Sequence, residues 1–183
     1  SLTRVAHARR EIGLALGEQP TAKGYPASVM SLIPSLVERA GMGDTTSGGS
    51  ITGIYTVLAD GDDTNDPVVD SARAILDGHV VLSRANAQMG IYPAVDISAS
   101  ISRVMNDIVD PKHLAAARRM RQLVSLYMEN RDLMLMGGYV EGQDADLDQA
   151  VKLWPKIVEF ISQRSDSRAD FKTSIRDLLA VAG

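Results

Sequence analysis

The residues best suited to chemistry lie within a short stretch in the middle of this chain of 183 residues, between Tyr92 and Arg103. Tyr92 offers a flat ring, and Pro93 fixes the backbone that follows it. Ser100 and Ser102 carry hydroxyl groups, and Arg103 carries a planar guanidinium that can grip a phosphate through two hydrogen bonds. This combination predicts a corner of the molecule that faces a nucleotide.

Two apolar segments upstream have the composition of strands that could position this corner. Residues 50–58 are rich in β-branched and aromatic side chains with few charges, which is typical of a strand covered on both faces in a parallel sheet. Residues 79–84 form a second such run, and a helical pattern over residues 68–76 separates the two. We therefore expect an α/β core.

The composition changes after Met105. Asp110 and Pro111 begin a long helical pattern that runs to about Glu129, and further helical patterns continue to residue 181. The arginines of the first helix, at positions 118, 119 and 121, lack interleaved aromatic residues and indicate a solvated or intersubunit face. We expect residues 1–108 to form the α/β part and residues 109–183 to form an all-helical domain.

An acidic loop follows the first predicted strand. Spaced carboxylates suggest calcium, but the loop lacks the glycine position and the closing glutamate of an EF-hand. An exposed loop at the carboxyl end of a strand is instead typical of a partner-binding surface. The predicted partner-binding residues are Asp60, Asp62, Asp63 and Asp66. The three histidines have no ligand partners at metal spacing, so no metal site is predicted.

The composition excludes several classes of protein. A net charge of −4 argues against a nucleic-acid-binding surface, and the absence of cysteine excludes thiol chemistry. No apolar stretch approaches the ~18 residues of a membrane span, so a cytoplasmic protein is predicted. The only glycine-rich stretch, residues 41–50, has no lysine and cannot be a phosphate-binding loop.

The run Pro93-Ala94-Val95-Asp96, followed by Ser100 and Ser102, resembles the signature of the ATPase alpha/beta family. This family includes the head subunits of rotary ATP synthases and the flagellum-specific and type III secretion ATPases. The opening Ser1-Leu2-Thr3-Arg4 resembles the secretion-type branch, in which these residues directly follow the aspartate that ends the Walker B strand. The resemblance implies the latter half of a RecA-like P-loop ATPase core, without its phosphate loop and Walker B strand, followed by an all-helical C-terminal domain.

The resemblance also implies roles for individual residues. Tyr92, beside Pro93, would stack on the adenine of ATP, and Arg103 would reach into a neighbouring subunit as an arginine finger. Arg4 would lie on the γ-phosphate side of the nucleotide, although a solvated helix charge is the alternative. An internal salt bridge is the alternative for Arg103. The main ligands of Mg²⁺ would lie upstream of this chain.

The function implied is that of a hexameric ATPase that couples ATP hydrolysis to the export of flagellar or type III secretion substrates, with this piece alone inactive. The implied partners are a central stalk protein at the acidic loop, the export apparatus, a stator-type regulator, and export substrates or chaperones. The implied location is cytoplasmic and peripheral to the inner membrane. The alternatives are a subunit of a rotary ATP synthase, catalytic or non-catalytic and alpha-like, and a Rho-type nucleic-acid motor, which the acidic composition disfavours.

Overall fold

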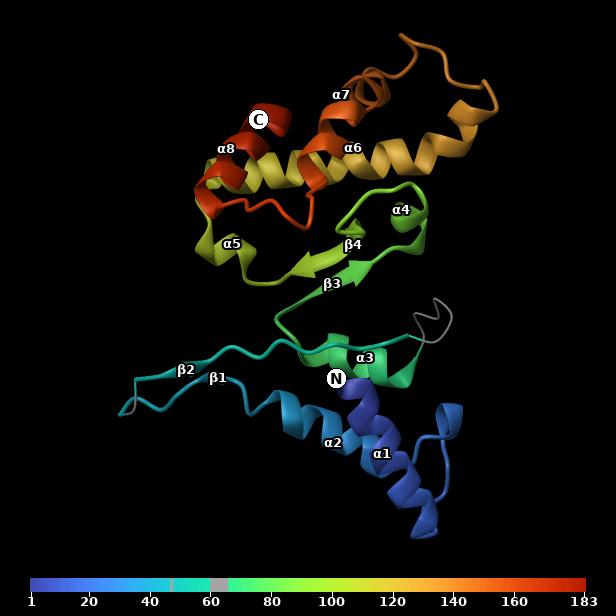
Figure 1. The fold of residues 1–183 in the computed structure, drawn as a ribbon, viewed down its shortest axis with the longest axis vertical. Helices are drawn as coiled ribbons and strands as arrows, with labels where there is room; N and C mark the ends of the chain where they lie inside the picture. The colour runs from blue at the N-terminus through green and yellow to red at the C-terminus, as the bar shows by residue number, and fades with distance from the viewer. Residues whose placement is uncertain (47, 60–65) are drawn as a thin grey trace. The chain divides into compact units, whose positions relative to one another are not determined.

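The computed structural model describes residues 1–46, 48–59 and 66–183, and they divide into two compact units, Ser1–Asp77 and Gly78–Gly183 (Figure 1). Each unit has its own cluster of buried apolar side chains. The boundary predicted after residue 108 falls inside the second unit, between two of its helices. The structural division follows contacts, whereas the predicted boundary separates an α/β part from a helical part.

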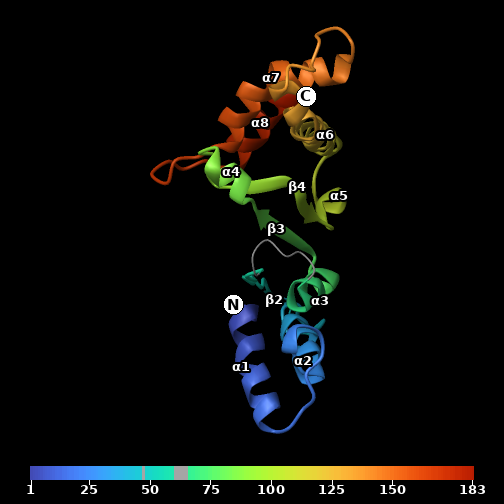
Figure 2. The ribbon, with the colours of Figure 1, turned by 90° about the vertical axis from the view of Figure 1, so that its right-hand side faces the viewer.

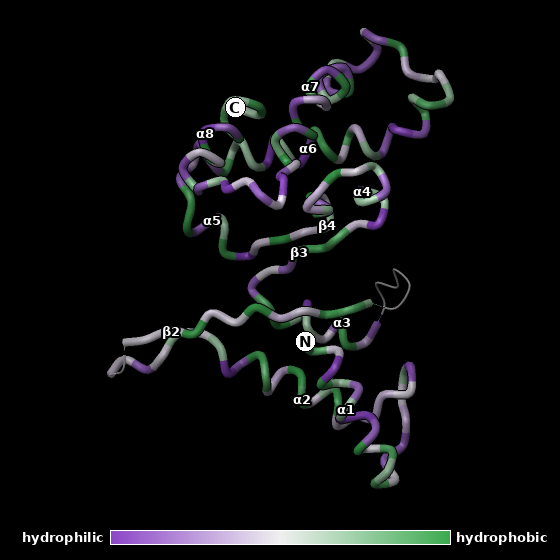
Figure 3. The backbone as a smooth tube through the Cα atoms, viewed as in Figure 1, coloured by the Kyte–Doolittle hydropathy of each residue, from purple (hydrophilic) through white to green (hydrophobic). Residues whose placement is uncertain are grey.

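The first unit is built on three helices, α1 (Leu2–Ala15), α2 (Ala27–Val37) and α3 (Pro67–Ile75), with the short 3₁₀ turn η1 (Ala22–Gly24) before α2. Figure 2 shows α1 and α2 side by side, and Figure 3 shows that α2 is largely apolar. Two short antiparallel strands, β1 (Gly41–Met42) and β2 (Ser50–Ile51), follow α2. The buried core consists of Leu2, Ala6, Tyr25, Val29, Ile33, Val37, Val68 and Ala72.

The strand predicted over residues 50–58 was wrong in its extent and burial. Only Ser50 and Ile51 are paired, and the partner strand is antiparallel. Tyr55 and Val57 pack against the core, whereas Ile54 and Leu58 are largely exposed. A strand needs a neighbouring strand to pair with, and no strand among the described residues pairs with residues 52–58.

The second unit combines a β-hairpin with a helical layer. β3 (Gly78–Leu82) pairs antiparallel with β4 (Val95–Ser102), and α4 (Arg84–Gln88) lies between them in the chain. α5 (Met105–Ile108) leads to three longer helices, α6 (Pro111–Leu135), α7 (Ala145–Ile161) and α8 (Phe171–Ala182). Their core consists of Ala116, Met120, Leu123, Val124, Ala150, Ile157, Leu178 and Ala182. The helical pattern predicted after Met105 is therefore confirmed.

The second predicted strand, residues 79–84, is present but is not buried as expected. Val80 and Leu82 are 70% and 71% exposed, whereas His79 and Val81 are partly buried. The strand belongs to a two-stranded antiparallel ladder, and the helix α6 packs on its partner β4. Because successive side chains alternate between the faces of a strand, such a hairpin covers only every second residue.

Aspartates begin the three longer helices of the second unit. Asp110 accepts hydrogen bonds from the backbone of Lys112 and His113, at 2.9 and 3.0 Å, and Asp144 and Asp170 cap α7 and α8 in the same way. The backbone bond from His113 is the main cause that lowers the pKa of Asp110. Within the described ranges, no helix combines the length and the apolar character needed to cross a bilayer.

Candidate nucleotide-binding site

The Tyr92–Pro93 corner is held between two anchored neighbours. Ile91 is 5% exposed, and its backbone N–H donates to the carbonyl of Asn86 at 3.0 Å. The side-chain amide of Asn86 then donates to the carbonyl of Val95 at 2.9 Å. The ring of Tyr92 is left 56% exposed between these anchors, so the fold presents an aromatic surface to solvent on a fixed backbone.

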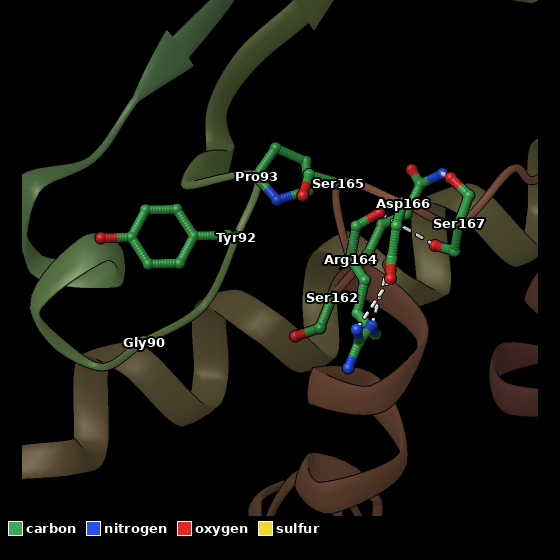
Figure 4. A pocket seen from close by; sticks show the side chains of 9 residues that line it. Gly90, Tyr92, Pro93, Ser162, Arg164, Ser165, Asp166 and Ser167 are labelled. Carbon is green, nitrogen blue, oxygen red and sulfur yellow. Dashed lines mark hydrogen bonds and ion pairs between the residues drawn. The ribbon is translucent and has the colours of Figure 1, made fainter.

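This corner forms one wall of an open pocket of about 920 Å³ (Figure 4). The other wall is the loop of residues 162–167, the first part of the connection from α7 to α8. The backbone N–H of Gln163 donates to the carbonyl of Tyr92 at 2.7 Å and ties the loop to the corner. The pocket therefore joins a flat aromatic wall to a polar one.

The loop is ordered by its own polar side chains. The guanidinium of Arg164 donates to both oxygens of Asp166 at 2.9 and 2.8 Å, and Figure 4 shows this pair apart from the Tyr92 ring. The hydrogen bond from Arg164 lowers the pKa of Asp166. The hydroxyl of Ser167 donates to the carbonyl of Arg164 at 2.9 Å. Sequence reasoning missed this loop, because its polar composition marks a connection but does not show that it folds back on Tyr92.

Ser100, predicted to offer its hydroxyl to the nucleotide, uses it inside the protein. The hydroxyl donates to the carbonyl of Asp96 at 2.5 Å and accepts from the backbone N–H of Val81 at 2.9 Å. The first bond lies within β4, and the second joins β4 to β3. The Ser100 hydroxyl therefore has a structural role, whereas Ser102 lies exposed at the end of β4.

Arg103 is exposed and directly follows β4, whereas Tyr92 precedes that strand. β4 pairs with the five-residue β3, with Ser102 opposite Gly78 and Val95 opposite Leu82, so the two ends of β4 lie roughly 13 Å apart at ~3.3 Å per residue. Within one chain, Tyr92 and Arg103 therefore lie beyond opposite ends of β4.

Arg4 lies in the first unit, exposed on the first turn of α1. The residues before it are anchored, since the backbone N–H of Leu2 donates to the carbonyl of Thr56 at 2.9 Å. The Thr3 hydroxyl accepts from the backbone N–H of Leu58 at 2.8 Å. These bonds fix the start of α1 beside the segment that leads into the acidic loop.

Of the predicted partner-binding residues, Asp60, Asp62 and Asp63 lie outside the residues that the structure describes. Asp66 is 6% exposed and accepts from the backbone N–H groups of Val68 and Val69, at 2.8 and 3.3 Å. It also lies 3.7 Å from the ammonium of Lys23. Asp66 therefore caps α3, and its side chain is not exposed for a partner.

The basic residues of α6 do not form one free patch. Arg119 donates to Asp146 at 3.1 Å and also bonds Gln149, so it joins α6 to α7. Arg118 donates to Asn106 at 3.2 Å. Among residues 1–46, 48–59 and 66–183, no three histidine, aspartate or glutamate side chains gather as a metal site.

Comparison with known proteins identifies the family of this chain. The sequence model of the ATP synthase alpha/beta family, nucleotide-binding domain, matches residues 1–102. The chain belongs to this family. A second model, the T3SS EscN ATPase C-terminal domain, matches residues 109–180.

Individual relatives agree with this membership. The flagellum-specific ATP synthase of Salmonella typhimurium is 54% identical over 178 residues, which is 97% of this chain and 39% of that protein. The Bacillus subtilis protein of the same name is 47% identical over 183 residues, or 100% of this chain and 41% of that protein. The chain thus spans about 40% of the length of the curated relatives it matches.

Solved structures confirm the predicted fold class. The assembled ATPase EscN of the enteropathogenic E. coli type III secretion system is 43% identical, with a TM-score of 0.93, over all of this chain and 44% of that one. EscN in complex with its central stalk EscO is 41% identical, with a TM-score of 0.86, over all of this chain and 43% of that one. The chain is the latter part of a RecA-like α/β ATPase core followed by a helical C-terminal domain.

Proposed function

We propose that this chain is part of a hexameric ATPase that couples ATP hydrolysis to the export of flagellar or type III secretion substrates. The observation that carries the proposal is the Tyr92 pocket, in a chain whose α/β part and helical part each match this class of ATPase. The relatives named flagellum-specific ATP synthase and the assembled EscN ATPase support the assignment.

In the proposed site, the ring of Tyr92 stacks on the adenine of ATP, with Pro93 beside it. Base–aromatic stacking contributes ~1–3 kcal/mol by alanine substitution. The loop opposite the ring carries Gln163 and Ser165, whose polar groups can meet the edge of the base. The aromatic wall matches the flat face of a purine, and the polar wall matches its hydrogen-bonding edge.

Arg103 acts in trans as an arginine finger on the nucleotide of a neighbouring subunit. Its exposed place at the far end of β4 from Tyr92 supports this. We assign Arg4, exposed at the start of α1, to the γ-phosphate of the bound nucleotide. Mg²⁺ accompanies ATP, and among the described residues no three histidine, aspartate or glutamate side chains gather to hold the ion.

The proposed partners follow from the assignment to this class of export ATPase. A central stalk protein contacts the loop of Asp60, Asp62 and Asp63, and the EscN–EscO complex of a related ATPase supports a stalk partner. The export apparatus, a stator-type regulator and export substrates or chaperones complete the set. The proposed location is the cytoplasm, peripheral to the inner membrane.

A subunit of a rotary ATP synthase is the second candidate, since the family includes both. The match of residues 109–180 to the EscN C-terminal domain favours the secretion branch. The net charge of −4 disfavours a Rho-type nucleic-acid motor, which would need a basic channel.

Two substitutions in the full-length ATPase test the proposal. Arg103→Ala should lower turnover by ~10³–10⁵-fold, because a finger arginine neutralises charge that develops in the transition state. Nucleotide affinity should stay within a few-fold. Tyr92→Ala should weaken nucleotide affinity ~5–150-fold, and Tyr92→Phe should retain it. Titration with a fluorescent nucleotide and steady-state phosphate release measure the two effects.

Mixed hexamers show whether Arg103 acts as an arginine finger or forms an internal salt bridge. Subunits with Arg103→Ala are mixed with subunits disabled in the upstream phosphate loop, so that some interfaces join an intact site to an intact finger. Recovered turnover supports the finger. No recovery in verified mixed hexamers would contradict it.

A further inference from the structure

β4 carries three more residues than the strand beside it. His79 pairs with Ile101, and Val81 pairs with Asp96. One residue, Val80, therefore separates the paired positions on β3, whereas four residues, 97–100, separate them on β4. The extra residues form a bulge between the Tyr92 end and the Arg103 end of β4.

Three side chains close this bulge. Asp96 accepts from the backbone N–H of Ala99 at 2.9 Å, and its own carbonyl accepts from the Ser100 hydroxyl at 2.5 Å. The Ser100 hydroxyl accepts in turn from the backbone N–H of Val81 at 2.9 Å. A ring nitrogen of His79 lies 3.1 Å from the carbonyl of Ala99. Ser100 is the central member, because its hydroxyl bonds a backbone group on each of the two strands.

The bulge decides which face of the hairpin the end of β4 presents. Side chains alternate along a strand, so an odd number of inserted residues exchanges the two faces downstream. Paired residues share a face, which places Ile101 on the same face as Asp96, five positions earlier. Without the bulge, Ile101 would lie on the opposite face, and the strand would deliver Arg103 with the other orientation.

We propose that Ser100 is a positioning residue for Arg103, and that its hydroxyl holds the bulge that aims the guanidinium at the neighbouring subunit. The inference rests on the proposed function. In this proposal, Ser100 and Asp96 of the signature shape β4, and other residues contact the nucleotide. A displacement of about 1 Å at a catalytic group can cost ~10²-fold in rate, so a released bulge should lower turnover without changing the base pocket.

The test compares Ser100→Thr with Ser100→Val in the full-length ATPase. These variants have nearly equal volume and differ in the hydroxyl. Ser100→Thr should keep most of the turnover, and Ser100→Val should lose ~10–100-fold in kcat with KM within a few-fold. Ser98→Ala is the matched control within the same bulge, because the Ser98 hydroxyl bonds Ser125 on α6, whereas the Ser100 hydroxyl joins the two strands. It should leave turnover unchanged.

A double variant shows whether Ser100 acts through Arg103. In the Arg103→Ala background, Ser100→Val should cause no further loss of turnover, because the group it positions is absent. Hydrogen exchange of the Val81 amide in the 183-residue chain gives a second readout. Exchange should be faster in Ser100→Val than in Ser100→Thr, whose hydroxyl still accepts from that amide.

The outcomes distinguish the inference from the proposed function. An equal loss from Ser100→Val with and without Arg103, or equal turnover of the Thr and Val variants, overturns the positioning role alone. Unchanged turnover in Arg103→Ala overturns the finger assignment and the inference with it.

Discussion

Tyr139 and Asp148 show how one hydrogen bond changes the acidity of a residue in the second unit. The Tyr139 hydroxyl donates to Asp148 at 2.7 Å, and the other carboxylate oxygen of Asp148 accepts from the backbone N–H of Gly142 at 2.8 Å. The bond to Asp148, followed by burial and the charges of Asp148 and Glu141, raises the pKa of Tyr139 to about 12. The pair closes the turn between α6 and α7.

The raised pKa predicts a dependence on pH at the alkaline end. The folded-state pKa of Tyr139 lies above the value of about 10 in an unfolded chain. The stabilisation is therefore complete below pH ~10 and is lost as the pH rises toward 12. Absorbance of tyrosinate, as the difference between the native chain and Tyr139→Phe, should show one group titrating near the upper value.

Asp148→Asn is the control for this residue. Without the carboxylate, the pKa of Tyr139 should fall toward the ordinary value for tyrosine. A titration of Tyr139 that does not differ between the native chain and Asp148→Asn would contradict the prediction.

At the scale of elements, α3 depends on a buried N-terminal cap. Asp66 accepts from the first free N–H groups of the helix and lies beside Lys23, and Pro67 occupies the first helical position. Asp66→Ala should lower the free energy of unfolding by about 1–2 kcal/mol, because these N–H groups lose their partner. Asp66→Asn should retain much of the cap. Urea unfolding measures the difference.

Asp70→Ala is the comparison for Asp66, because Asp70 is exposed in the first turn of the same helix and caps no N–H group. Its loss removes only a favourable interaction with the helix dipole, ~0.3–1 kcal/mol. Equal losses from both alanine variants would show that the Asp66 cap contributes nothing specific.

At the scale of the whole molecule, the chain contains the proposed aromatic surface for the base and the proposed finger arginine, but no sequence G-x-x-x-x-G-K-[ST]. Phosphoryl transfer depends on positioning and charge stabilisation at the phosphates. The 183-residue chain, assayed alone, should therefore release phosphate from ATP no faster than buffer. Release that scales with protein and is reduced by Tyr92→Ala would contradict this.

The local sequence determined the helices, the caps and the signature. The patterns after Met105 predicted the helical part because an amphipathic helix repeats within a few residues, and Asp110 caps α6 through amides only two and three positions away. The signature between Pro93 and Arg103 predicted the family for the same reason, since its residues lie within one stretch of chain.

The tertiary structure alone decided how these parts meet. The 162–167 loop bonds Tyr92 across about seventy positions of sequence, and the Ser100 hydroxyl bonds Val81 on another strand. The composition of residues 50–58 favours a strand, but it does not show which backbone lies beside the segment. Only Ser50 and Ile51 are paired. Composition and periodicity describe what a segment can do alone, but hydrogen bonds and register depend on which distant backbone lies beside it.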